Sequence, residues 1–149
     1  MARRSLVWRG REVTAKMRAA QIAGVNATMG ASVVEAKNSH AWKNRSGTLE
    51  GGIGITDFAR EERGGVRGLW GVQDVVYALI HELGGTIVPK TAADLAIPQA
   101  DGSVRLVKSV TIPPRPYLRP AADAKYPGLA ANIRRAFAAS TARGGGSDG

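Results

Sequence analysis

Residues 11–40 read REVTAKMRAAQIAGVNATMGASVVEAKNSH, a stretch without proline that is rich in alanine. Strong helix formers predominate in it, so we predict one long helix. Apolar and small residues recur at alternating spacings of four and three, a 3.5-residue repeat that is typical of a packing seam. The repeat consists of Val13, Met17, Ala20, Gly24, Ala27, Ala31 and Val34.

The middle of this repeat is small, which allows another backbone to come close. A second apolar row lies beside the first and consists of Ile22, Val25, Met29 and Val33. A helix with so wide an apolar arc packs in more than one direction. The helix could pack on a sheet of the same domain, or alternatively on a second subunit. In the second case Gly24, Ala27 and Ala31 are candidate subunit-interface residues.

The rest of the chain alternates between strand-like and helical patterns. We predict strands at 53–58 and 66–72 around a charged turn, and a helix at 75–83 that Asp74 caps and Gly84-Gly85 ends. Further strands are expected at 86–88, 95–97 and 104–112, and a last helix at 121–139 with Pro120 in its first turn.

This order predicts an α+β fold, in which a long N-terminal helix and a C-terminal helix pack on a small, mostly antiparallel sheet. We expect an N-terminal arm at 1–10, a single domain at 11–140 and a flexible glycine-rich tail at 141–149.

Composition excludes several classes of protein. With 149 residues, 44% hydrophobic and 22% charged, the chain has an ordinary globular mix. It contains no cysteine, which rules out disulfides and thiolate metal sites, and only two histidines. No apolar stretch approaches the roughly 18 residues of a membrane-spanning helix. The basic start lacks the apolar core of a secretion signal, so we expect neither secretion nor a membrane partner.

The formal net charge of +9 favours an anionic partner such as nucleic acid. The basic residues occur in short groups rather than one run, which also fits a merely solvated basic surface. Aromatic residues make up 5% of the chain, too few for a base-stacking platform.

Three patterns suggest chemistry and fail on inspection. His81-Glu82 begins the helical zinc motif His-Glu-x-x-His, but Gly85 stands where the second histidine would be. The glycines at 51–54 lack the remaining residues of a nucleotide-binding loop, and a glycine-rich strand start is the better interpretation. The carboxylates at 57–62 alternate with arginines, as in a solvated hairpin tip. We therefore predict no enzyme activity, no cofactor and no metal.

The segment PPRPYLRPA at 113–121 is stiffened by its prolines. Neighbouring residues of an extended chain point in opposite directions. If Leu118 anchors the segment in the core, Tyr117 and Arg115 face outward. Arg115, Pro116, Tyr117 and Arg119 are therefore candidate subunit-interface residues. The alternative is that the segment braces the last helix against the sheet within one subunit.

Three motifs in this order carry a resemblance: NRSGTL at 44–49, YALIHELGGT at 77–86 and the 113–121 segment. Together they resemble the neck or tail-completion proteins of long-tailed bacteriophages, often labelled putative tail components. VPKTAADLAIP at 88–98 is similar to the related virion-morphogenesis proteins of Mu-type phages. The chain departs from the family pattern by an extra glycine, Gly85, and by Tyr117 where phenylalanine is usual.

The resemblance implies a structural virion protein of the phage neck, at the head–tail junction, that forms a ring around the DNA channel. A hexamer is favoured because tails of these families are sixfold, and a dodecamer would match a portal-side position. Implied partners are adjacent neck, stopper and tail-tube or terminator proteins, and packaged DNA that passes through without sequence recognition. The protein would be made in the host cytoplasm and reside in the virion. The alternative from charge alone is a small basic nucleic-acid-binding module.

Overall fold

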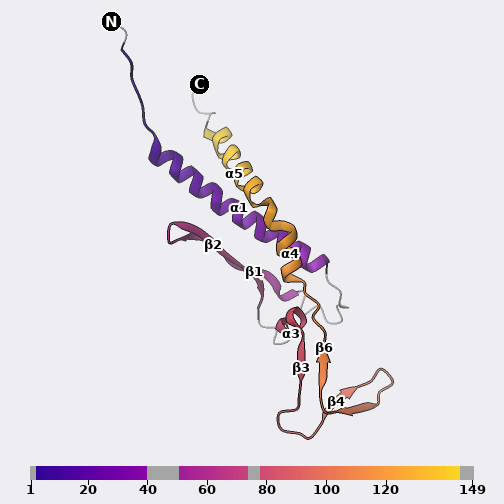
Figure 1. Ribbon diagram of the computed structural model, residues 1–149. Coiled ribbons are helices and arrows are strands. Elements are labelled where there is room, and N and C mark those ends of the chain that lie inside the picture. Colours follow the sequence, from indigo (N-terminus) through magenta and orange to yellow (C-terminus); the bar gives the residue numbers. More distant parts are fainter. Residues whose placement is uncertain (1–2, 40–50, 74–77, 145–149) are drawn as a thin grey trace.

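The structure is a computed structural model that describes residues 3–39, 51–73 and 78–144 (Figure 1). Two helices run side by side in opposite directions, α1 (Gly10–Asn38) and α5 (Leu129–Gly144), so both ends of the chain lie at the same end of the molecule. The long helix predicted at 11–40 is confirmed up to Asn38, and the α+β fold class is confirmed.

A row of small residues spaced four apart forms the buried face of α1: Ala20, Gly24, Thr28, Ser32 and Ala36. A Cβ atom at Gly24 would lie 2.4 Å from Ile133 Cγ1, which shows how closely α5 approaches. The Thr28 hydroxyl donates to the Gly24 carbonyl and accepts a bond of 2.9 Å from the Asn132 side chain of α5. Small residues thus let two helix backbones come near each other while the hydroxyls stay satisfied.

The predicted 3.5-residue seam is therefore wrong as a continuous contact. Val13, Met17, Ala27 and Val34 are exposed, whereas Ala20 and Gly24 are buried. A seam of that period stays on one face only when two helices supercoil over their whole length. Here α1 presents the ridge of residues four apart, the usual contact of helices that cross without supercoiling.

The strands β1 (Ile53–Glu62) and β2 (Gly65–Val72) form an antiparallel hairpin beside α1. The turn consists of Arg63 and Gly64, which both have positive φ. Arg18 of α1 donates to the Gly64 carbonyl at 2.8 Å, and the Ala59 N–H donates to the Asn26 side chain at 2.8 Å. These bonds attach the hairpin along the helix. The predicted strands here are confirmed; Gly51 and Gly52, however, are helical.

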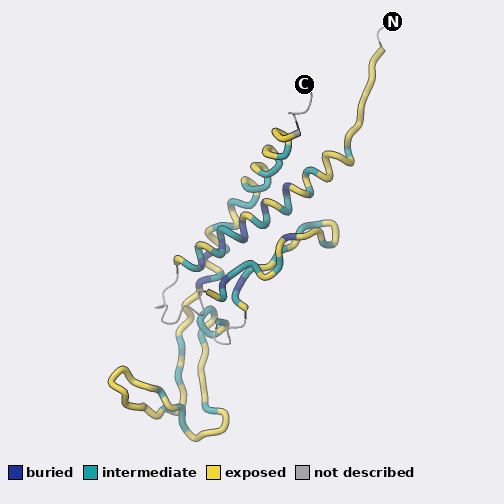
Figure 2. The backbone as a smooth tube through the Cα atoms, turned by 180° about the vertical axis from the view of Figure 1, so that it is seen from behind, coloured by how far each residue is buried: buried dark blue, intermediate teal, exposed yellow. Residues whose placement is uncertain are grey.

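The core lies where the C-terminal half of α1 meets the hairpin and the start of α4 (Leu118–Lys125). Ala36, Ile53, Tyr117 and Ala121 are buried together. Trp70, Val72 and Leu118 pack around them and are partly buried. Figure 2 shows that the buried positions of the described residues lie in α1, in the β1–β2 hairpin and at the start of α4.

The last helix is divided, contrary to the single helix predicted at 121–139. A 3₁₀ turn, η1 (Tyr126–Gly128), separates α4 from α5. Pro127 lacks the N–H that a continuous helix needs, and Gly128 favours helix least after proline. Helix α5 then continues to Gly144, so residues 141–144 are helical rather than part of a flexible tail.

The chain between the short helix α3 (Ala78–Leu83) and α4 forms an excursion from the body, which we call the β-arm (residues 85–112). Strand β3 (Gly85–Ile87) pairs with β6 (Val110–Ile112), and β4 (Leu95–Pro98) pairs with β5 (Val104–Val107). The strand predicted at 104–112 is thus two strands. The described strands form three separate two-stranded antiparallel sheets rather than the one small sheet expected, and α1 packs on the β1–β2 hairpin.

Three expectations fall on residues outside the described ranges. These are the Asp74 cap, the NRSGTL motif at 44–49 and the glycine-rich stretch at 145–149. Within the expected N-terminal arm at 1–10, residues 3–9 belong to no helix or strand, and α1 begins at Gly10.

The α1–α5 contact generates a paired test. Gly24→Leu inserts a side chain where Ile133 already lies, so it should lower the free energy of unfolding by about 1–3 kcal/mol or more. Ala27→Leu places the same side chain on the exposed face of α1, so it should melt like the wild type. Urea titration followed by circular dichroism measures both. Equal losses for the two variants would contradict this packing.

Candidate functional site

The Glu82 carboxylate holds the point where the chain returns from the β-arm. It accepts hydrogen bonds from the backbone N–H groups of Tyr117 (2.8 Å), Leu118 (3.1 Å) and Arg119 (3.0 Å). N–H groups in the first turn of a helix have no partner within that helix, and the helix dipole favours a negative charge there. Glu82 of α3 therefore acts as the N-terminal cap of α4 from a different element.

The base of the β-arm is closed by two further backbone contacts. The Arg115 N–H donates to the His81 carbonyl at 2.7 Å. Gly84 has φ +71°, and a Cβ atom there would lie 2.7 Å from the Pro114 nitrogen and 2.8 Å from the Ile112 carbonyl oxygen. Only glycine suits both the positive φ and this close approach. The predicted glycine stop after the helix thus also lets the two strands of the arm meet.

Tyr117 is the clearest correction to the predicted interface. Its side chain is 1% exposed and belongs to the core, whereas Leu118, the expected anchor, is only partly buried. Both side chains lie against the core because the bonds to Glu82 turn the chain into a helix at Leu118, so the alternation of an extended chain does not apply. This matches the alternative interpretation, in which the segment braces the last helix. Burial, and then the charge of Glu82, raise the pKa of Tyr117 to about 12.

The other predicted interface residues divide into two groups. Arg115, Pro116 and Arg119 are exposed, so their contact with a neighbouring subunit stays a prediction. Gly24 is not free to meet another subunit, because Ile133 of the same chain occupies the space in front of it. Ala27 is exposed and Ala31 is partly exposed, and neither lies in the buried row.

The β-arm is the surface that the sequence reasoning missed. The structure describes all of residues 85–112 and none of them is buried. One face of the β4–β5 hairpin carries only apolar side chains, all exposed: Ala96, Pro98, Val104 and Leu106. Leu95, Ile97 and Val107 lie on the other face and are half-buried. The hairpin is therefore apolar on both faces, and period-2 apolar alternation alone could not reveal that pattern.

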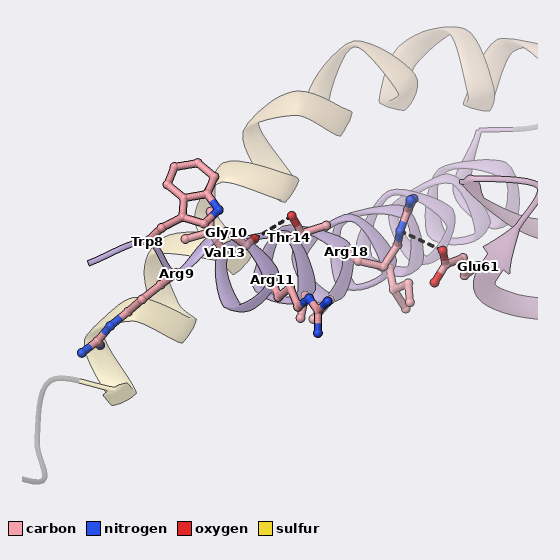
Figure 3. Close-up of a pocket in the computed structure, with 11 residues that line it drawn as sticks. Trp8, Arg9, Gly10, Arg11, Val13, Thr14, Arg18 and Glu61 are labelled. Carbon is pink, nitrogen blue, oxygen red and sulfur yellow. Dashed lines mark hydrogen bonds and ion pairs between the residues drawn. The ribbon is translucent and has the colours of Figure 1, made fainter. Parts of the chain in front are cut away.

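A second unfilled surface lies along the first turns of α1 (Figure 3). A groove of about 980 Å³ is lined by apolar residues of α1 that include Val13, Ala19 and Ile22, with Trp8 at its end. The Arg18–Glu61 ion pair borders it. Trp8 itself is 85% exposed, so its indole ring packs little on its own chain.

The patterns rejected as catalytic show structural roles. The hairpin carboxylates form ion pairs, Asp57 with Arg60, Glu62 with Arg67 and Glu61 with Arg18. His81-Glu82 ends a helix at Leu83, and Glu82 binds backbone N–H groups. Within the described ranges, no three His, Asp or Glu side chains are grouped as a metal site would need. No helix in those ranges has the length and apolar character to cross a membrane.

Comparison of the chain with protein-family models, with curated proteins and with solved structures gives no significant match.

Glu82 can be tested by truncation. Glu82→Ala leaves the first N–H groups of α4 without their acceptor and should lower the free energy of unfolding by about 1–3 kcal/mol. Glu62→Ala removes an exposed partner of Arg67 and should cost less than about 1 kcal/mol. Urea denaturation compares the two. A Glu82→Ala variant as stable as Glu62→Ala would show that the cap does not hold the fold.

Because the pKa of Tyr117 is raised, we expect the free energy of unfolding to fall in strong alkali. Its pKa in the folded chain, about 12, lies above the ordinary value of 10.0, so the unfolded chain loses this proton first. This contribution to stability is complete below pH 10 and is lost as pH rises from about 10 to 12. NMR of the tyrosine ring signals, with urea midpoints across that range, measures both effects. Titration of Tyr117 near 10 in the folded protein would contradict its burial.

Proposed function

We propose that this protein is a structural subunit of a phage neck that assembles into a ring around the DNA channel at the head–tail junction. The β-arm is the observation that carries the proposal. An isolated two-stranded hairpin is at best marginally stable in water, and the β4–β5 hairpin exposes one wholly apolar face. Val104 is 59% and Leu106 is 65% exposed. The free energy falls when another protein covers such a surface, because apolar area is removed from water.

A second copy of the chain is a suitable cover for the β-arm. The body carries its own exposed apolar residues, among them Phe58 and Leu69 of the β1–β2 hairpin and Leu79 and Leu83 of α3. The arm projects away from the body (Figure 1). Contact between the arm of one copy and the body of the next joins two different surfaces. Such heterologous contacts close into rings when the rotation between copies permits it.

The ordered motifs described above supply the biological setting, because they resemble neck and tail-completion proteins. On that basis we propose a hexamer, with a dodecamer as the portal-side alternative. Adjacent neck, stopper and tail-tube or terminator proteins would be the partners, and the virion would be the final location. The proposed role is structural and involves no catalysis. The net charge of +9 keeps a nucleic-acid-binding module as the second candidate.

The register of the β-arm allows it to be removed cleanly. Ile87 and Val110 are paired residues of β3 and β6, so deletion of 88–109 with an Asn-Gly link between them forms a two-residue hairpin turn. We expect the wild type to form a ring and this variant to be a folded monomer. Light scattering after size-exclusion chromatography measures the mass, and circular dichroism checks the fold.

A finer test uses two faces of one strand. Val104→Ser with Leu106→Ser should weaken assembly, whereas Arg105→Ser on the opposite face should leave it closer to the wild type. A wild-type chain that stays monomeric at all concentrations, or a deletion variant that still assembles, would overturn the proposal.

A further inference from the structure

The net charge of the chain is concentrated at one end of the molecule. Because α1 and α5 run antiparallel, residues 3–23 and 134–144 lie together beyond the Gly24–Ile133 contact (Figure 1), and we call them the basic end. This end holds nine of the 21 basic residues and one of the 12 acidic residues, Glu12. It therefore carries +8 of the total +9. The short groups that looked dispersed along the sequence are gathered in space.

Most of these cations are available to a partner. Lys16 pairs with Glu12, and Arg18 pairs with Glu61. The others are exposed and make no ion pair within the part of the chain that the structure describes: Arg3, Arg4, Arg9, Arg11, Arg134, Arg135 and Arg143. Eight of the nine basic residues are arginines, whose planar guanidinium groups bind phosphate oxygens in pairs.

The outer face of α5 has the composition of a surface that meets phosphates. The sequence of α5 contains no acidic residue. Its exposed positions hold alanines and Thr141 beside the arginines, so no large side chain keeps a partner at a distance. Arg135 and Arg143 are eight residues apart, about 12 Å along the helix axis and within about 80° of each other around it. Duplex DNA carries one negative charge per about 1.7 Å of its axis, so this row spans several phosphates.

We propose that the basic end binds the phosphate backbone of duplex DNA without reading its sequence. This inference rests on the proposed function and assigns the surface of the ring subunit that faces DNA. The exposed face of α5 offers no large apolar side chain to enter a bilayer, although Leu6, Val7 and Trp8 of the arm are exposed. We commit to DNA because the proposed ring surrounds it, and lipid binding is an outcome of the test. Contacts to phosphate oxygens carry no sequence information, so a surface that binds through them accepts a duplex of any sequence.

The test uses the full chain and a fluorescent duplex of mixed sequence, with anisotropy measured over a series of salt concentrations. Arg134→Gln with Arg135→Gln removes two charges from the basic end. Lys37→Gln with Lys125→Gln removes two charges far from the basic end, one at the C-terminal end of α1 and one at the end of α4, where Lys125 pairs with Glu35. The arginine variant should bind more weakly, and its slope of log affinity against log salt should become shallower by about 1.8. The lysine variant should keep the wild-type slope.

Three results would overturn the inference. Equal weakening of DNA binding by both variants would show that binding depends on the overall charge and not on the basic end. Wild-type binding to vesicles of phosphatidylglycerol and phosphatidylcholine, without binding to the duplex, would make the surface a lipid-binding one. A sequence preference that persists in high salt would indicate base reading. Light scattering on the same samples separates the two proposals. A wild type that forms a ring but does not bind DNA counts against this inference alone, and a wild type that forms no ring counts against the proposed function.

Discussion

The fold depends on the Glu82 carboxylate, which binds the first N–H groups of α4. This contact joins α3, before the β-arm, to the helix that follows it. It fixes the residue at which the helix begins, and so places Tyr117 in the core beside Ile53 and Ala36. Without an acceptor those N–H groups would lie beside the core with unmet hydrogen-bonding capacity, which is costly. The whole excursion of residues 85–112 can therefore leave the body and return at one fixed point.

The consequence is a molecule with two unlike parts. The body encloses its small core with α1, α4, α5 and the β1–β2 hairpin, and close contacts at small residues such as Gly24 hold it together. The β-arm has no buried residue, and one face of its outer hairpin consists of exposed apolar side chains. At the opposite end of the helical body, the antiparallel helices gather the positive charge. In the ring that we propose, this separation lets one surface contact a neighbouring subunit and the other contact DNA.

Much of the fold could be predicted from local sequence. The helix from residue 11, the β1–β2 hairpin and the glycine stop at Gly84 all follow from propensity, alternation and backbone freedom. Pro127-Gly128 could have predicted the break at Tyr126–Gly128, because both residues disfavour helix. The helical pattern on either side of them led instead to the prediction of one helix at 121–139. The prediction of a single sheet is wrong, because the pattern of residues within a strand does not determine which strands pair. The β-arm has no sequence signature of its own, since an exposed apolar strand has the same composition as a buried one.

The candidate site was predictable only in part, and for a physical reason. The motif around Glu82 and the segment at 113–121 were both singled out, but their mutual contact is not local. The hydrogen bond from the Tyr117 N–H to Glu82, 35 residues earlier, turns Tyr117 inward. The alternation of side chains along a strand cannot predict a contact between residues so far apart. The charge pattern is similar, because only the antiparallel packing of α1 and α5 shows that arginines at both ends of the chain form one surface.

Hydrogen–deuterium exchange of the β-arm amides tests the central claim most directly, namely that another copy of the chain covers this arm. Exchange is measured on the same protein in its assembled form and after dilution to monomers. We expect slow exchange at 85–87, 95–97, 104–107 and 110–112 in the assembly and nearly unprotected exchange in the monomer, with α1 protected in both. Strong protection of the arm in the monomer, or none in the assembly, would contradict it.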